Sequence, residues 1–196
     1  MTQPSKHPGV LIVLCGPSGV GKSTISRCLA KTLDVSYTVS ATTREKRLGD
    51  EAGKQYDHVD GAEFFRRLDR DEFLEYAEVH GNYYGTPKHP AIDYLAEGRD
   101  VLLEIDVQGA LQIRYQYPDA LLIFLLPPDE PTLLQRLRDR AREGEDEIDK
   151  RFRAAKREIH MAKGSRAFDY MVINDDLDQA VEEIVKIIKH KHAGGI

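Results

Sequence analysis

Four short apolar runs recur along the chain, at Val10–Cys15, Val101–Ile105, Leu121–Leu126 and Tyr170–Ile173. None of them alternates strictly between apolar and polar positions, which is typical of strands buried on both faces of a parallel sheet. A segment with helical spacing of apolar residues follows each run. Alternating strands and helices predict an α/β fold in which helices flank a parallel sheet.

The predicted helices have apolar residues about three or four positions apart, and acidic residues precede two of them. Asp129 and Pro131 suit the N-cap and first turn of one helix, and Asp175-Asp176 precede the last helix. The apolar positions are Ile25, Cys28, Leu29 and Leu33; Leu133, Leu134 and Leu137; Ile148, Phe152, Ala155 and Ile159; and Leu177, Val181, Ile184, Val185 and Ile188.

The stretch from about Ser36 to Pro90 interrupts this alternation. It holds turn glycines, several tyrosines and short alternating segments, which predict an inserted, mostly antiparallel β lobe. We therefore assign residues 37–89 to the lobe and residues 1–36 and 90–196 to a core domain.

The composition is that of a soluble globular domain: 31% of the 196 residues are charged and 41% are apolar. The net charge of −5 argues against general nucleic-acid binding, no apolar run approaches the ~20 residues that span a bilayer, and residues 1–8 lack the apolar stretch of a signal peptide. Cys15 and Cys28 fall in predicted core elements, as expected of reduced, buried thiols in a cytoplasmic protein. No Cys-x-x-Cys pair suggests zinc.

Residues 16–23 read Gly-Pro-Ser-Gly-Val-Gly-Lys-Ser, the P-loop pattern, between an apolar run and a predicted helix. Glycines in such a loop let backbone N–H groups converge on an anion. Lys22 can then reach the outer phosphates of a nucleoside triphosphate, and the Ser23 hydroxyl can ligate Mg²⁺. The chain is therefore predicted to bind a nucleoside triphosphate.

Other stretches suggest what receives the phosphate. Arg44 and Arg47 lie three residues apart beside hydroxyls and fit either a phosphate clamp or a charged β edge. Residues 81–85, Gly-Asn-Tyr-Tyr-Gly, form either a turn that presents tyrosine hydroxyls to a phosphate or a hairpin packed by two rings. Asp106 ends a core strand, where an acid that supports magnesium belongs; it also suits a helix N-cap, and the two roles are compatible.

The segment Arg140–Lys150 is charged and, apart from Ala141, lacks apolar residues until Ile148. This composition fits either a mobile lid, at about 138–151, or an ordinary solvated loop. Arginines flank it, and arginines brought in by a closing flap can stabilise the charge of a transferring phosphoryl group. Solvated helix faces are the other interpretation of these arginines, which are Arg136, Arg140, Arg142 and Arg151.

In this order the motifs resemble those of guanylate kinases, and the likeness runs from about Val10 to Ile188. The shared motifs are the P-loop, Ser40-x-Thr-Thr-Arg44-x-x-Arg47, Gly81-Asn82-Tyr83-Tyr84-Gly85-Thr86, Ile105-Asp106-x-Gln108-Gly109 and Val172-Ile173-Asn174-Asp175-Asp176. The resemblance implies a P-loop NTPase core, a lobe that binds a nucleoside monophosphate, and a lid. It also implies the transfer of the γ-phosphate of ATP to GMP, with Mg²⁺, in purine nucleotide metabolism.

The resemblance assigns roles to individual residues. The implied ATP-binding residues are Gly16, Pro17, Ser18, Gly19, Val20, Gly21, Lys22, Ser23, Thr24 and Asn174, the last near adenine. The implied GMP-binding residues are Arg44, Arg47, Tyr56 and Tyr84 around the phosphate, with Ser40, Glu75, Thr86, Glu104 and Asp106. The implied catalytic residues are Lys22, Arg44, Arg136, Arg140 and Arg151, and the implied metal-supporting residues are Ser23 and Asp106.

Hydrogen-bonding chemistry supports guanine independently. Guanine presents adjacent N1–H and N2–H₂ donors, which suit a carboxylate at Glu75, and an O6 acceptor, which suits a hydroxyl at Thr86. Adenine would set a lone pair against Glu75, and a mispaired polar site rejects the wrong base. Two residues depart from the family pattern: Lys46 replaces a common Pro, and Ala141 replaces the usual Gly. Neither change removes a catalytic group.

Other functions fit parts of this pattern. Lys22 and Ser23 argue against a non-catalytic guanylate-kinase-like module that binds a phosphopeptide. Glu75 and Thr86 argue against a P-loop kinase whose acceptor is a phosphorylated ribose, and the paired arginines argue against a nucleotide switch without kinase activity. We expect ATP and GMP as partners, without nucleic acid or membrane, and self-association into a homo-oligomer stays open.

Overall fold

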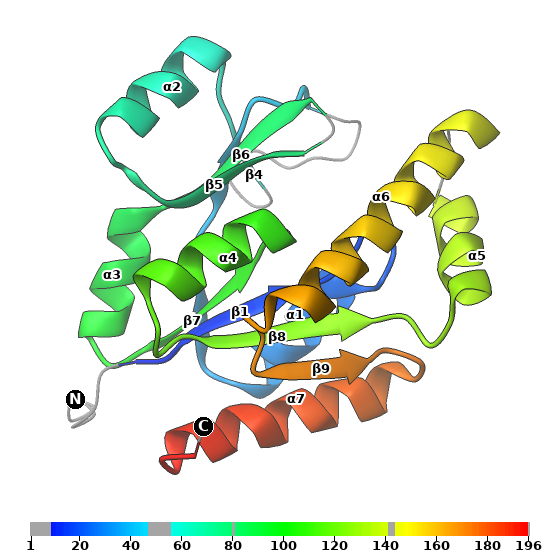
Figure 1. Ribbon diagram of the computed structural model, residues 1–196. Coiled ribbons are helices and arrows are strands. Elements are labelled where there is room, and N and C mark those ends of the chain that lie inside the picture. Colours follow the sequence, from blue (N-terminus) through cyan, green and yellow to red (C-terminus); the bar gives the residue numbers. More distant parts are fainter. Residues whose placement is uncertain (1–8, 47–55, 80, 141–143, 196) are drawn as a thin grey trace.

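The computed structural model describes residues 9–46, 56–79, 81–140 and 144–195. The predicted α/β core is confirmed: its five strands form a parallel sheet in the order β2-β7-β1-β8-β9 (Figure 1). The strands are β1 (Leu11–Cys15), β2 (Val35–Tyr37), β7 (Asp100–Glu104), β8 (Leu121–Leu126) and β9 (Tyr170–Ile173). All but β2 correspond to the predicted apolar runs. The edge strand β2 was missed because its three residues carry no long apolar pattern.

Helices cover both faces of this sheet (Figure 1). Side chains of the central strand β1 alternate between two apolar clusters: Ile12 and Leu14 pack with α1 and α7, while Val13 and Cys15 pack with α4 and α6. This two-sided burial is why the strands read as continuous apolar runs. The core helices are α1 (Lys22–Thr32), α3 (Lys88–Ala96), α4 (Val107–Gln116), α5 (Glu130–Arg140), α6 (Glu145–Ser165) and α7 (Leu177–His192).

The inserted segment folds as a second sheet in the order β4-β3-β6-β5. Strand β6 runs antiparallel to β3 and β5, as expected, while β4 runs parallel to β3. The elements are β3 (Ser40–Thr42), β4 (Tyr56–His58), α2 (Gly61–Asp69), β5 (Phe73–Val79) and β6 (Asn82–Pro87). Helix α2 was not predicted, although Asp60 caps it by accepting a hydrogen bond from the Glu63 N–H. The helix buries Phe64 against Phe73 and Ala41.

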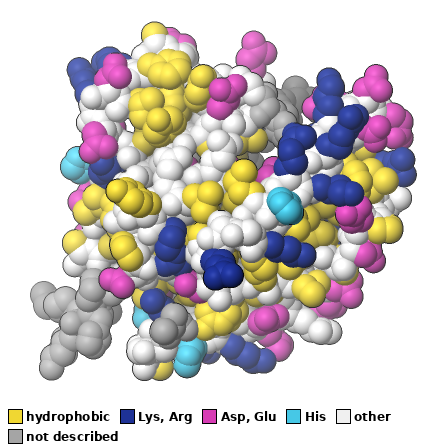
Figure 2. Space-filling model, viewed as in Figure 1, with side chains coloured by type: hydrophobic (Ala, Val, Ile, Leu, Met, Phe, Trp, Pro, Cys, Tyr) yellow, Lys and Arg dark blue, Asp and Glu magenta, His cyan; other side chains and the backbone are white. Residues whose placement is uncertain are grey.

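The charged stretch Arg140–Lys150 is less irregular than its composition predicted. Helix α5 runs to Arg140 and α6 begins at Glu145, so only a short connection separates them, and residues 141–143 lie outside the described residues. Three acidic residues occupy the first turn of α6, where the helix dipole favours negative charge. Figure 2 shows this acidic tip, with Lys and Arg side chains following along α6. An apolar cluster that includes Leu137 and Ile148 holds the two helices together.

The two cysteines differ in burial. Cys15 is fully buried in β1, and burial raises the pKa of its thiol, which makes it a poor nucleophile. Cys28 on α1 is only partly buried, so the expectation that both thiols are buried was wrong for Cys28. Both thiols are free. None of the helices in the described ranges is long and apolar enough to cross a membrane.

The lobe has its own apolar cluster, so it should lose structure separately from the core. Phe64→Ala removes the fully buried ring of that cluster, which typically costs about 3–5 kcal/mol. We expect faster amide hydrogen exchange in β5 and β6 but unchanged exchange in β1 and β8. Phe124→Ala, in the core cluster, is the matched control and should speed exchange in the core sheet. Equal acceleration in both sheets by Phe64→Ala would contradict this separation.

Candidate functional site

The P-loop joins β1 to α1 at the carboxyl end of the central strand. Gly21 caps α1 in the left-handed region, with φ of 104°. A Cβ atom at this glycine would lie 2.4 Å from Nδ2 of Asn174. That amide is buried and donates to the Val20 carbonyl at 2.7 Å. Asn174 therefore braces the P-loop in this structure, while its contact with adenine stays a prediction.

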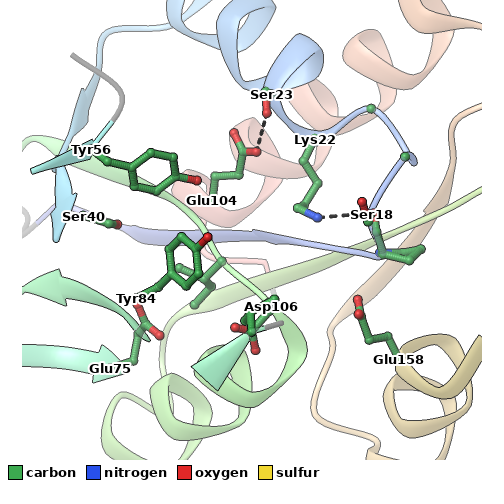
Figure 3. Close-up of a pocket in the computed structure, with 15 residues that line it drawn as sticks. Ser18, Lys22, Ser23, Ser40, Tyr56, Glu75, Tyr84, Glu104, Asp106 and Glu158 are labelled. Atoms are coloured by element: carbon green, nitrogen blue, oxygen red, sulfur yellow. Dashed lines mark hydrogen bonds between the residues drawn. The ribbon is translucent and has the colours of Figure 1, made fainter. Parts of the chain in front are cut away.

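The Lys22 and Ser23 side chains of the P-loop both have hydrogen-bond partners within the protein. The Lys22 ammonium donates to the carbonyl oxygens of Gly16 and Pro17. The Ser23 hydroxyl donates to Oε1 of Glu104 at 2.6 Å (Figure 3). Phosphate oxygens are stronger acceptors than carbonyl groups, so Lys22 can exchange its partners for an anion without breaking the fold.

A cavity of about 260 Å³ separates the P-loop from the lobe. The lobe contributes Ser40, Tyr56, Glu75 and Tyr84, and these side chains face the P-loop lysine and serine across the cavity in Figure 3. The end of β7 contributes Glu104, Ile105 and Asp106, because β7 is the neighbour of β1 in the sheet. Ligands of parallel α/β sheets bind at these strand ends.

Glu75 is the most unusual group in the cavity. Its side chain, on β5, is only 4% exposed, and Oε1 accepts a hydrogen bond of 2.5 Å from the Thr86 hydroxyl. The Ser40 hydroxyl lies 3.4 Å from that of Thr86. Burial raises the pKa of Glu75 to about 7, the negative charge of Asp106 adds to the increase, and the Thr86 bond opposes it. Glu75 is therefore a hydrogen-bond acceptor with little water around it.

Asp106 serves as the N-cap of α4. Its Oδ1 accepts hydrogen bonds from the backbone N–H groups of Gln108, at 2.6 Å, and Gly109, at 3.2 Å. Burial raises the pKa of Asp106, although these two hydrogen bonds and the charge of Lys22 act in the opposite direction. The predicted N-cap role is thus observed, and the same carboxyl lines the cavity.

Only one arginine of the predicted phosphate clamp, Arg44, lies within the described residues. The Arg44 guanidinium lies over the Tyr56 ring, 5.5 Å from its centroid, and Tyr56 meets Tyr84 edge to face at 5.6 Å. These three residues therefore form one group on the lobe side of the cavity. Arg47 lies outside the described residues.

The sequence model of the guanylate kinase family matches residues 9–191. The chain belongs to the guanylate kinase family. It is 46% identical over 184 residues to the guanylate kinase of Caldanaerobacter subterraneus subsp. tengcongensis, covering 93% of this chain and 88% of that protein. It is 44% identical over 183 residues to the guanylate kinase of Carboxydothermus hydrogenoformans, covering 93% of this chain and 88% of that protein. A crystal structure of guanylate kinase from Anaplasma phagocytophilum superposes with a TM-score of 0.80 at 33% identity, covering 95% of this chain and 87% of that one.

These matches confirm the resemblance inferred from the motifs and, with the fold, the P-loop kinase class. They do not favour a non-catalytic module or a kinase with another acceptor. Two of the predicted arginines contact the P-loop or the residue that braces it, and their catalytic role stays a prediction. Arg151 donates to the Ser18 hydroxyl at 3.0 Å, and Arg136 donates to the Asn174 carbonyl at 2.9 Å. Arg140 ends α5, and its side chain lies outside the described part of the structure.

Two further acids line the cavity. Glu104, grouped with the GMP-binding residues, accepts a hydrogen bond from the hydroxyl of Ser23, the predicted magnesium ligand, and its contact with GMP stays a prediction. Glu158 was missed; it lines the cavity from α6, and burial raises its pKa against the opposing charge of Lys22. One signal was available, because Glu158 lies on the apolar face of α6 between the buried Ala155 and Ala162.

The raised pKa of Glu75 predicts how stability depends on pH. The carboxyl has a higher pKa in the folded protein than in the unfolded chain. Its contribution to the free energy of unfolding is therefore fully present below about pH 4.5 and is lost as pH rises through about 7. Glu75→Gln has no carboxyl to titrate, so it should not show this loss of stability. We expect the variant to gain free energy of unfolding relative to the wild type between pH 5 and 8, by on the order of 3 kcal/mol.

Urea unfolding of the nucleotide-free protein across this pH range measures the difference. Glu78→Gln, an exposed change on the same strand, is the matched control and should follow the wild type. A difference between Glu75→Gln and wild type that stays constant from pH 5 to 8 would show that Glu75 titrates normally.

Proposed function

We propose that this protein transfers the γ-phosphate of ATP to GMP, giving ADP and GDP. The observation that carries the proposal is the buried Glu75–Thr86 pair, whose Glu75 lines the cavity opposite the P-loop. A P-loop alone indicates a nucleoside triphosphate, whereas this pair indicates which acceptor lies opposite it. Family membership supports the same reaction.

Guanine completes the hydrogen bonding of the pair. The two oxygens of an ionised Glu75 accept from N1–H and N2–H of the base. The Thr86 hydroxyl can donate only one hydrogen bond, and in the free protein it donates it to Glu75. Once the base donors satisfy the carboxylate, Thr86 can donate to O6 instead, or Ser40 can donate to O6 in its place. Asp106 also lines the cavity and offers a further acceptor.

The phosphates lie at the opposite end. Lys22 and the backbone N–H groups of the P-loop hold the ATP phosphates, and Arg44 with Tyr56 and Tyr84 holds the GMP phosphate. A GMP phosphate oxygen then attacks the γ-phosphorus in line. That phosphate is already largely ionised, so no side chain needs to act as a general base. The protein contributes positioning and electrostatic stabilisation.

Magnesium fits the oxygen donors beside the P-loop. Among the described residues no group of three His, Cys, Asp or Glu side chains could hold a metal alone, and Mg²⁺ is usually held by one or two protein oxygens together with substrate phosphates. Ser23 is the direct ligand in this proposal, with Glu104 and Asp106 supporting it at the end of β7. When bound, the ion neutralises negative charge on the phosphates.

The hairpin of α5 and α6 serves as the lid, at about 138–151, with residues 37–89 as the GMP-binding lobe. Arg136, Arg140 and Arg151 supply positive charge to the transferring phosphoryl group. Arg151 already reaches the P-loop at Ser18, so its path to the phosphates is short. We place the reaction in purine nucleotide metabolism in the cytoplasm, with ATP and GMP as the small-molecule partners.

Lys22→Ala tests the P-loop half of the proposal. The ammonium contributes charge to the phosphates and no apolar packing, so the variant should fold normally and lose at least about 100-fold in turnover. An ADP-release assay with GMP, AMP, CMP and UMP measures activity and base preference together. Lys31→Ala, an exposed change at the other end of α1, should match the wild type. The proposal fails if wild-type protein does not prefer GMP, or if Lys22→Ala retains more than about a tenth of wild-type turnover.

Glu75→Gln tests the base-reading half. It keeps the shape of the side chain but places an amide where two acceptor oxygens are needed. We expect a fall in kcat/KM for GMP that corresponds to a loss of about 2–4 kcal/mol of transition-state stabilisation. The KM for ATP should be nearly unchanged. Glu78→Gln is again the control. Unchanged GMP kinetics in the Glu75 variant would show that this carboxylate does not read the base.

A further inference from the structure

Helix α4 of the core is bound directly to the edge strand β5 of the lobe. The Gln112 side-chain amide pairs with both backbone groups of Tyr76: Nε2 donates to its carbonyl at 2.6 Å, and Oε1 accepts from its N–H at 3.2 Å. Gln108 adds a longer bond, at 3.4 Å, to the Glu78 carbonyl. These bonds set the spacing between α4 and β5 at the strand position next to Glu75.

Gly109 lies on α4 between these two glutamines and is buried. A Cβ atom built on it would lie 2.2 Å from Oε2 of Glu75 and 2.9 Å from its Cδ, closer than Cβ atoms in real structures come to any neighbour. The carboxylate of Glu75 therefore occupies the space that any other side chain at position 109 would need.

The backbone gives no other reason for a glycine at this position. Gly109 is the third residue of α4 and has no positive φ. Glycine costs up to about 1 kcal/mol relative to alanine in a helix, the full amount applying to the interior. Helix propensity therefore does not favour glycine here, and the contact with Glu75 is the feature that requires it.

Glu75 has little freedom to move away from a methyl group. Its side chain is 4% exposed, Thr86 holds one carboxylate oxygen, and the paired amide of Gln112 holds the neighbouring residue of its strand. A displaced carboxylate would lose the hydrogen bond from Thr86, and its oxygens would no longer hold their present orientation in the cavity. Gly109 also donates its N–H to Asp106, so its backbone lies beside two of the carboxylates that line the cavity.

We propose that Gly109 is a specificity-determining positioning residue: its missing side chain lets the Glu75 carboxylate lie against α4 with both oxygens aimed at the guanine donors. This inference rests on the proposed GMP kinase activity and assigns the base preference partly to a residue that does not touch the base. A methyl group at position 109 should impair base reading without impairing the ATP site.

The test compares Gly109→Ala with the wild type. We expect the KM for GMP to rise roughly tenfold or more, as for the loss of a hydrogen bond to a charged group, while the KM for ATP stays within about twofold. IMP has N1–H and O6 but lacks the 2-amino group, so it probes the second Glu75 contact. The preference for GMP over IMP should fall by roughly tenfold or more in the variant.

Gly164→Ala is the matched control, because this glycine lies in α6 with nothing within 4 Å of the added Cβ. It should match the wild type in all kinetic constants. In a Glu75→Gln background, Gly109→Ala should change GMP kinetics much less than it does in the wild type, because the carboxylate it displaces is already absent. Additive effects in this cycle would overturn the inference.

Stability separates misplacement of Glu75 from a general structural defect. If Gly109→Ala lowers the melting temperature, Glu75→Ala should raise it more in the Gly109→Ala chain than in the wild type, because only there does the change also empty the contested space. An equal increase in both chains, or equal losses in GMP and ATP kinetics, overturns the inference. If the wild type uses GMP and Gly109→Ala behaves like Gly164→Ala, the inference falls and the proposed function stands. A wild type that does not use GMP overturns both.

Discussion

The site depends on one carboxylate that is buried before its ligand arrives. Glu75 has lost most of its water, and the Thr86 hydroxyl replaces only one of its hydrogen bonds. The remaining acceptor capacity is costly in the free protein, and this cost appears as the raised pKa of Glu75. A ligand with two adjacent N–H donors removes the cost. The desolvation of Glu75 therefore takes place on folding, and binding of the base does not have to supply it.

The fold separates this base end of the cavity from the phosphate end. Glu75 comes from the inserted lobe, whereas Lys22 and Ser23 come from the loop after β1. Asp106, at the start of α4, interacts electrostatically with both Glu75 and Lys22. Strands β1 and β7 are neighbours, so the P-loop and the acids after β7 meet at one edge of the sheet. In the proposed function, Glu75 binds the base and Lys22 lies on the phosphate side, so a nucleoside monophosphate would bind with its phosphate toward the P-loop. In-line transfer needs this orientation.

Local patterns predicted part of this arrangement. The P-loop, the four long core strands and the N-cap at Asp106 follow from short stretches of sequence, because each depends on neighbouring residues. The partner of Glu104 and the cavity position of Glu158 could not be predicted this way, because both depend on how β7 and α6 pack around the P-loop. Helix α2 and the first turns of α6 were missed for another reason: their charged residues resemble those of loops, although acids at a helix start are favourable.

The most direct test of the central claim is the pKa of Glu75 itself. Proteins with ¹³C-labelled glutamate carboxyl groups, with Glu75→Gln used for assignment, allow its titration to be followed by NMR with and without saturating GMP. We predict a pKa near 7 in the free protein and a value at least about one unit lower with GMP, because the base donors stabilise the ionised form. AMP should cause no such decrease. A pKa near the ordinary glutamate value in the free protein, or one that GMP leaves unchanged, would contradict the claim.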